Sequence, residues 1–177
     1  MPQHIVVSAY CSVWKIMFEE EAKVIKGILG KNCTAIYHIG STSVPKLSAK
    51  PIIDIMPIVL DMQKVDEKKS EFEILGYEYV GELGIPGRRY LRKGKEERTH
   101  QIHIFEQSNK QDIQRHIAVR DYLRTHQEVA RQYEALKRTL AQKFPYDITG
   151  YCNGKESFMQ KLEQEALIWK KNADLLE

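Results

Sequence analysis

The chain has 177 residues, of which 42% are hydrophobic and 29% are charged, and this composition predicts one globular domain over residues 1–177. It contains no run of about 20 apolar residues and no secretory opening, so we expect no membrane association and a cytoplasmic location. The three well-separated cysteines fit a reducing compartment, and a net charge of +3 argues against nucleic acid as a partner.

The first half of the sequence predicts helices and strands in alternation. Apolar residues recur at helical spacing over 12–29, which predicts a helix. Segment 34–39 is rich in β-branched and aromatic residues and predicts a strand that ends at Gly40. The almost continuously apolar segment 51–60 predicts a central buried strand, and 61–75 predicts a second helix.

The second half predicts strands first and then helices. Three short strands are expected, at residues 77–80, 89–92 and 101–105. From residue 108 onward the pattern is helical, with breaks near His126 and across 145–154, which gives about three helices. The expected fold is mixed α+β, with a sheet flanked by helices and a helical C-terminal third.

The turn after the first expected strand has the residues of a phosphate-binding loop. Gly40 lets the main chain approach a ligand closely, and Ser41 and Thr42 add hydroxyl groups. An ordinary polar turn that caps a helix is the alternative interpretation.

A single acid, Asp54, interrupts the apolar central strand. An unpaired carboxylate in such a strand is costly, so Asp54 needs a partner, and a metal ion is one candidate. A structural ion pair with His38, His103 or Arg89 is the alternative.

Several longer segments form a pattern that is specific when taken together. They are HIGSTSVP at 38–45, KPIIDI at 50–55, GELGIPGRRY at 81–90, His103 in its strand, and RDYLR at 120–124. With these segments the chain resembles the GrpB-like proteins of the nucleotidyltransferase-fold superfamily over nearly its whole length. The resemblance implies a nucleotidyltransferase-like mixed sheet.

In that superfamily, a Gly-Ser turn precedes a strand that bears two acids, and a third acid comes from a neighbouring strand. These carboxylates hold two metal ions that align a triphosphate. Asp54 matches the first acid, Met56 stands at the second position, and the third falls near His103. The resemblance therefore implies at most a single Mg²⁺ site, with Asp54 and Glu82 as protein ligands and substrate phosphates completing the shell.

The expected catalytic residues are thus Asp54, Glu82 and His103. The expected ligand-binding residues are Gly40, Ser41, Thr42, Lys50 and Arg89. Because side chains alternate along a strand, one residue of the Arg88-Arg89 pair is expected to face the pocket, and Arg89 is chosen. The segment around Glu82 also fits a plain hairpin turn.

The helical third contains one weak candidate for the site and one pair of residues at surface spacing. Arg120 is a weak candidate for ligand contact, and Tyr133 with Lys137 fits an i, i+4 surface pair.

The expected function is binding of a nucleoside triphosphate or another phosphorylated ligand, with metal-dependent nucleotidyl transfer to an unknown acceptor. The alternative is a non-catalytic ligand-binding or regulatory module that kept the fold and lost the metal-binding acids. RNA binding through the C-terminal helices is a third interpretation, and their mixed charge weakens it.

Overall fold

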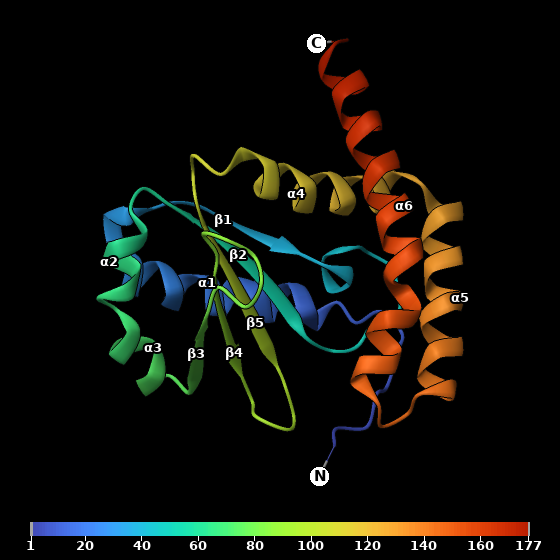
Figure 1. Ribbon diagram of the computed structural model, residues 1–177, viewed down its shortest axis with the longest axis horizontal. Helices are drawn as coiled ribbons and strands as arrows, with labels where there is room; N and C mark the ends of the chain where they lie inside the picture. Colours follow the sequence, from blue (N-terminus) through green and yellow to red (C-terminus); the bar gives the residue numbers. More distant parts are fainter. Residues whose placement is uncertain (1, 177) are drawn as a thin grey trace.

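A computed structural model describes residues 2–176 (Figure 1). The strands are β1 (Cys33–Ile39), β2 (Ile53–Val59), β3 (Tyr77–Gly81), β4 (Arg89–Lys93) and β5 (His100–Glu106). The helices are α1 (Val13–Leu29), α2 (Met62–Asp66), α3 (Lys69–Ile74), α4 (Lys110–Thr125), α5 (Gln127–Lys143) and α6 (Ile148–Asp174), with short 3-10 turns η1 (Gly30–Asn32) and η2 (Ser41–Ser43). The predicted mixed α+β fold with a helical C-terminal third is confirmed.

The five strands form one mixed sheet in the order β1-β2-β5-β4-β3. β2 and β5 are parallel, and the other neighbouring pairs are antiparallel. β2 lies between β1 and β5, which explains why its sequence is almost continuously apolar. Asp54 is therefore carried by a strand that has neighbours on both sides.

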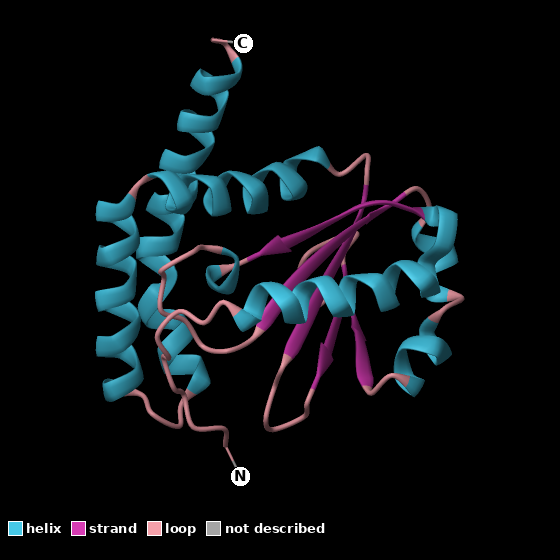
Figure 2. Ribbon diagram, turned by 180° about the vertical axis from the view of Figure 1, so that it is seen from behind, coloured by secondary structure: helices cyan, strands magenta, loops and turns pink. Residues whose placement is uncertain are grey.

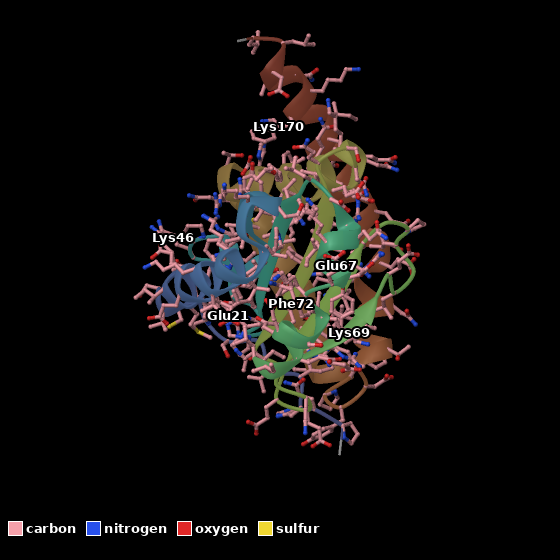
Figure 3. All side chains as sticks on the ribbon, turned by 90° about the vertical axis from the view of Figure 1, so that its left-hand side faces the viewer. Glu21, Lys46, Glu67, Lys69, Phe72 and Lys170 are labelled. Carbon is pink, nitrogen blue, oxygen red and sulfur yellow. The ribbon has the colours of Figure 1, made fainter. Side chains whose placement is uncertain are left out.

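The two faces of the sheet pack against different helices because side chains alternate along each strand. One face contributes Ile53 and Ile55 to a core that includes Trp14 of α1 and Phe72 of α3. Figure 2 shows α1 lying across this face, and Figure 3 labels Phe72. The other face contributes Met56 to a second core, against which Ile113 and Ile117 of α4 pack. Asp54 alternates with Ile53 and Ile55, so it points to the α4 side.

Helices α5 and α6 lie side by side at one end of the sheet, and α4 extends from them over one face of the sheet (Figure 1). α4 and α5 meet at His126, as predicted, whereas the second break is shorter than the predicted 145–154. α6 already begins at Ile148, because the Asp147 side chain caps it by accepting a hydrogen bond from the Gly150 N–H at 3.0 Å.

The predicted helix over 61–75 is interrupted, and α2 and α3 are separate helices. Asp66, the last residue of α2, binds Arg89 of β4 and accepts a hydrogen bond from Tyr79 at 2.7 Å.

Within residues 2–176, no helix combines the length and the apolar character needed to cross a membrane.

Candidate functional site

The turn between β1 and η2 depends on Gly40. Its φ of 72° and ψ of −175° belong to a backbone region that only glycine adopts without strain. A Cβ atom at this position would lie 2.6 Å from the Asp54 Oδ2 atom. Glycine is therefore needed both for the turn and for the close approach of the turn to Asp54.

The three hydroxyl groups after Gly40 have different partners. The Thr42 hydroxyl donates to the Ile52 carbonyl at 3.2 Å. The same hydroxyl oxygen lies 2.9 Å from the His38 Nε2 atom. The Ser43 hydroxyl donates back to the Gly40 carbonyl. The Thr42 and Ser43 hydroxyls thus donate to backbone carbonyls, whereas the Ser41 hydroxyl forms a hydrogen bond with the side chain of Tyr133, which also lines the cavity described below.

His38 lies on the α1 side of the sheet, where its ring stacks on Phe18 with a centroid distance of 4.8 Å. Burial lowers the pKa of His38 to about 4, so the ring is neutral at pH 7. A neutral His38 must donate from Nε2 to Thr42, whose own proton is used elsewhere. His38 thus helps to fix Thr42, and with it the turn after Gly40, from the α1 side of the sheet.

Asp54 ends a chain of polar contacts that begins at Arg88. The Asp54 Oδ1 atom lies 3.0 Å from His103 Nε2, and the Arg88 guanidinium faces His103 Nδ1 at 3.5 Å. Since a guanidinium group only donates, Nδ1 accepts a hydrogen bond from Arg88. The Nε2 atom therefore carries a proton and donates a hydrogen bond to Asp54. Arg88 is itself fixed by hydrogen bonds to the carbonyls of Glu82 and Leu83.

The structure places Arg88, and not the expected Arg89, on the Asp54 face of the sheet. Arg89 points to the opposite face, where its guanidinium donates to both oxygens of Asp66 at 2.7 and 3.0 Å. Glu82 is exposed in the β3–β4 loop, and its carboxylate accepts the Gly87 N–H at 3.2 Å. Neither Glu82 nor Arg89 lines the cavity described below, so the expected Asp54 and Glu82 ligand pair is not assembled.

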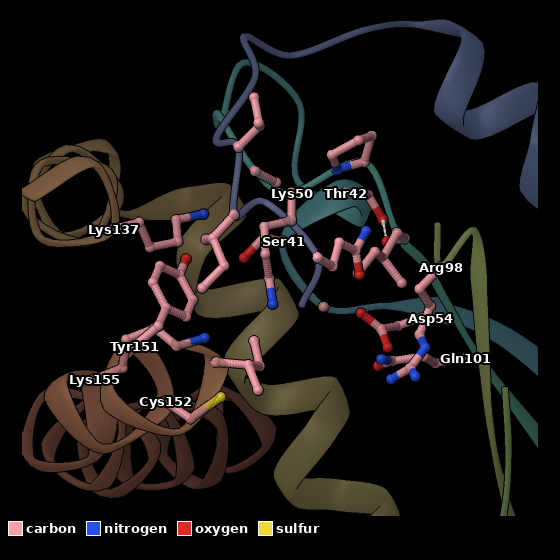
Figure 4. Close-up of a pocket in the computed structure, with 18 of the residues that line it drawn as sticks. Ser41, Thr42, Lys50, Asp54, Arg98, Gln101, Lys137, Tyr151, Cys152 and Lys155 are labelled. Atoms are coloured by element: carbon pink, nitrogen blue, oxygen red, sulfur yellow. Dashed lines mark hydrogen bonds between the residues drawn. The ribbon is translucent and has the colours of Figure 1, made fainter. Parts of the chain in front are cut away.

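A cavity of about 770 Å³ opens between this end of the sheet and the helices α5 and α6 (Figure 4). This volume lies within the usual range for small-molecule sites. Five of the expected site residues line it: Gly40, Ser41, Thr42, Lys50 and Asp54. Arg120, the weak candidate, lines the cavity as well. His103 lies behind Asp54 and is connected to the cavity only by its hydrogen bond to that residue.

Three lysines surround Tyr133 and Tyr151 at the end of the cavity formed by the helices. The ammonium groups of Lys50 and Lys155 lie 4.9 and 4.6 Å from the Tyr151 ring centroid. The Lys137 ammonium lies 4.4 Å from the Tyr133 ring centroid. Among the described residues, no carboxylate forms a salt bridge with any of the three.

Burial and mutual repulsion disfavour the charged forms of these lysines. Burial, and then the charge of Lys155, lowers the pKa of Lys137 to about 7, and the same two causes lower the pKa of Lys50. Burial also lowers the pKa of Lys155. An anion in the cavity would favour the charged forms of these lysines and offset their repulsion.

Two buried polar atoms at the cavity have no hydrogen-bond partner within residues 2–176. They are the hydroxyl of Tyr151, whose side chain is fully buried, and the Nε atom of Arg98. Both residues line the cavity, and Figure 4 shows them on its two sides. Buried polar atoms are normally paired, so these two indicate where a polar ligand would bind.

Helices α5 and α4 are attached by hydrogen bonds to η2 and to the loop that follows it. Ser48 N–H donates to Glu134 at 3.0 Å, and the Ser48 carbonyl and hydroxyl accept from Lys137 and Arg138. Arg124 donates to the Ser43 carbonyl at 3.0 and 2.8 Å through two of its nitrogens. These contacts hold the helical wall against the loop that connects Gly40 to Asp54.

The side chains at this site do not fit a metal centre built by the protein alone. Within residues 2–176, no three His, Cys, Asp or Glu side chains converge in the way a metal site requires. Met56 is fully buried among apolar residues, and His103 donates a hydrogen bond to Asp54. Beside the Gly40 turn, the arrangement would therefore offer the Asp54 carboxylate to Mg²⁺, which prefers a shell of oxygen ligands.

The sheet order, with the Gly40 turn set against Asp54 of the next strand, defines a nucleotidyltransferase-like fold. A similar fold occurs in Cid1, solved in complex with its short product ApU, with a TM-score of 0.52. The sequences are 11% identical, and the likeness covers 76% of this chain and 42% of the Cid1 chain. At this identity the likeness shows the fold alone.

Within this class, the chain belongs to the GrpB family, since the family described as GrpB protein matches residues 4–165. The crystal structure of conserved protein GrpB from Enterococcus faecalis is 50% identical, with a TM-score of 0.91 over 93% of this chain and 99% of that chain. The predicted family resemblance is thus confirmed.

Two curated relatives extend the comparison. UPF0157 protein YqkA of Bacillus subtilis is 42% identical over 162 residues, and the match covers 92% of this chain and 47% of YqkA. Glutamate-rich protein GrpB of Alkalihalophilus pseudofirmus is 30% identical over 91% of this chain and 95% of its own length. The chain spans about half the length of YqkA and nearly the whole length of the second relative.

Replacing Gly40 with alanine should destabilise the protein by about 1 to 3 kcal/mol, because alanine is strained at this φ and ψ and its Cβ meets Asp54. Urea unfolding of Gly40→Ala measures the loss. Gly27→Ala is the matched control, since a Cβ there meets nothing within 4 Å and alanine favours the helix by up to about 1 kcal/mol. Equal stability of Gly40→Ala and the wild type would contradict the described turn.

The free energy of unfolding should rise from pH 7 to pH 9. The pKa of Lys137 is about 7 in the folded state against an ordinary 10.5, so the unfolded state binds more protons between these values. Lys137→Met should flatten part of the rise, whereas Lys161→Met, at an exposed position on α6, should leave it unchanged. Urea titrations at several pH values measure both slopes, and identical slopes in wild type and Lys137→Met would count against a depressed pKa.

Proposed function

We propose that the cavity binds a nucleoside triphosphate or another phosphorylated small molecule. The observation that supports this function best is the cluster of Lys50, Lys137 and Lys155, which faces a cavity of about 770 Å³ without a salt bridge to any described carboxylate. A phosphate group supplies the missing negative charge and several strong hydrogen-bond acceptors.

The two ends of the cavity suit different parts of such a ligand. The lysine end, with the unpaired Tyr151 hydroxyl, offers charge-assisted hydrogen bonds to the most highly charged part of a ligand. The sheet end offers the Ser41 hydroxyl and the close approach of the Gly40 backbone next to Asp54. A phosphate chain that spans the cavity would contact both ends.

Binding of ATP or inorganic triphosphate should stabilise the protein and should depend on Lys155. We expect Lys155→Met to weaken the affinity by about tenfold or more, equivalent to about 1.4 kcal/mol, because a charge-assisted hydrogen bond is lost. Isothermal titration calorimetry measures the dissociation constants, and the accompanying rise in melting temperature follows from mass action.

Lys161→Met is the control for this experiment, because Lys161 lies on the same helix and its side chain is 78% exposed. Its affinity should equal that of the wild type. Absence of heat and of a thermal shift with both ligands would refute phosphate binding, and an equal loss in both variants would show that the cavity is not the site.

Nucleotidyl transfer to an acceptor hydroxyl is a second candidate function, favoured by the position of Asp54 beside Gly40 and Ser41 in a nucleotidyltransferase-like fold. In this reaction the acceptor oxygen attacks the α-phosphate, and pyrophosphate leaves. Asp54 would orient the acceptor or accept its proton, and His103 would hold Asp54 in place through the bond to Oδ1. Mg²⁺ bound to the triphosphate would neutralise charge on the phosphates, with Asp54 as its protein carboxylate.

If transfer occurs, pyrophosphate release on adding candidate acceptors with ATP and Mg²⁺ should fall by about 10²-fold or more in Asp54→Asn, which keeps the shape of the side chain and removes its charge. A coupled pyrophosphate assay measures the rate. Asp66→Asn, on the opposite face of the sheet, should retain the wild-type rate. Full activity of Asp54→Asn would exclude this role, and the binding function would stand by itself.

A further inference from the structure

We infer that ligand binding in this cavity requires no divalent cation, because Arg98 supplies the positive charge at the Asp54 end. The inference rests on the proposed binding of a phosphorylated ligand and concerns the binding step alone. It is carried by the donors and acceptors that surround Asp54, by the position of Arg98, and by the charges that line the cavity.

One oxygen of Asp54 already has a partner in the protein. Oδ1 accepts a hydrogen bond from His103 Nε2 at 3.0 Å, and Arg88 faces the other nitrogen of the same ring. Oδ2 lies beside the Gly40 backbone, and the Asp54 side chain is 23% exposed where it lines the cavity. A metal ion at Oδ1 would have to displace a donor that is held from behind by Arg88, whose side chain is buried.

The positions next to Asp54 on β2 and β5 supply no second carboxylate. Met56, two residues along β2 on the same face, is fully buried in an apolar cluster. Gln101 of β5 lines the cavity beside Asp54, but its amide is neutral and cannot balance a divalent charge. The Asp54 end therefore lacks the carboxylates that would hold a metal ion for the ligand.

Arg98 brings a permanent positive charge to the same place. It comes from the hairpin between β4 and β5 and lines the cavity, and Figure 4 shows its side chain on the side of Asp54 and Gln101. Its Nε atom is buried and has no hydrogen-bond partner within residues 2–176. A guanidinium group cannot lose its proton near pH 7 and presents donors in a geometry that matches phosphate oxygens.

The hairpin that carries Arg98 is tight. Gly94 has a φ of 99°, and a Cβ atom there would lie 2.2 Å from the Glu97 carbonyl oxygen. The Thr99 N–H donates to the Lys93 carbonyl at 3.0 Å and closes the loop. The turn thus constrains the backbone that carries Arg98, which lowers the backbone part of the entropy cost of binding.

The lining of the cavity has the charge balance expected for an anion that binds without metal. Among the described residues, six cationic and two acidic side chains line it; the cations are Lys50, Lys95, Arg98, Arg120, Lys137 and Lys155, and the acids are Asp54 and Glu96. Arg120 pairs with Asp121 at 2.9 Å, and the remaining cations still outnumber the two acids. The protein itself therefore supplies cations for an anionic ligand.

The test is calorimetric titration of the full-length protein with ATP, once in EDTA and once in excess MgCl2. Wild type should bind in EDTA at least as tightly as in MgCl2. Arg98→Met should weaken binding in EDTA by about tenfold or more. Arg98→Lys, which keeps the charge and loses the planar fork, should give an intermediate affinity. Arg92→Met is the control, because Arg92 lies on β4 of the same hairpin and pairs with Glu78.

Each result has a distinct meaning. Wild-type binding that appears only with MgCl2 would overturn the inference and leave the proposed function intact. Wild-type affinity of Arg98→Met in EDTA would remove Arg98 from the site. No binding in either buffer would overturn the proposed function together with the inference. Thermal melts of all variants, without ligand, separate loss of fold from loss of binding, and the comparison of wild type in the two buffers needs no variant.

Discussion

The candidate site depends on the attachment of α4 and α5 to the loop that follows η2. Ser48 is bound through its N–H, its carbonyl and its hydroxyl by three side chains of α5, and Ser43 is bound through its carbonyl by Arg124 of α4. Without these contacts, α4 and α5 would not cover the loop that joins Gly40 to Asp54, and this end of the sheet would be exposed to solvent. The same contacts bring Lys137 to its buried position.

The attachment brings like charges together, which has an energetic cost. Lys137 and Lys155 approach Lys50 in surroundings that carry few acids, and burial disfavours their ammonium forms. Aromatic faces offset part of this cost, since Tyr133 and Tyr151 lie under the ammonium groups. Residues that are kept at a cost to stability are typical of binding sites, where the ligand completes the interaction.

Local patterns in the sequence predicted the fold well. The apolar segment around Ile53 and Ile55 indicated the central strand, and the helical periodicity before Gly30 indicated α1. The Gly40 turn next to Asp54 was predicted because the two residues are close in sequence. The break before α6 was predicted to extend too far, to residue 154, whereas Gly154 lies within the helix, where Leu140 packs against it.

The other half of the candidate site could not be predicted from local patterns. Tyr133 and Lys137 have the spacing of a surface pair, and only the packing of α5 on the Ser48 loop buries them. Arg98 sits in a charged hairpin that has the composition of an exposed loop. The choice between Arg88 and Arg89 depended on the register between β4 and β5, which pairs Tyr90 with His103 and so puts Arg88 on the Asp54 face.

The cavity joins residues from the first third of the chain to residues near its end, and this separation has a consequence during protein synthesis. A nascent chain exposes Gly40 and Asp54 long before the ribosome has added Tyr151 and Lys155. A chain that has been synthesised only as far as Asp54 therefore lacks the wall of the cavity that α5 and α6 supply. The cavity is complete once α6 packs against α4 and α5, so any ligand that binds there would stabilise the folded state and take no part in early folding.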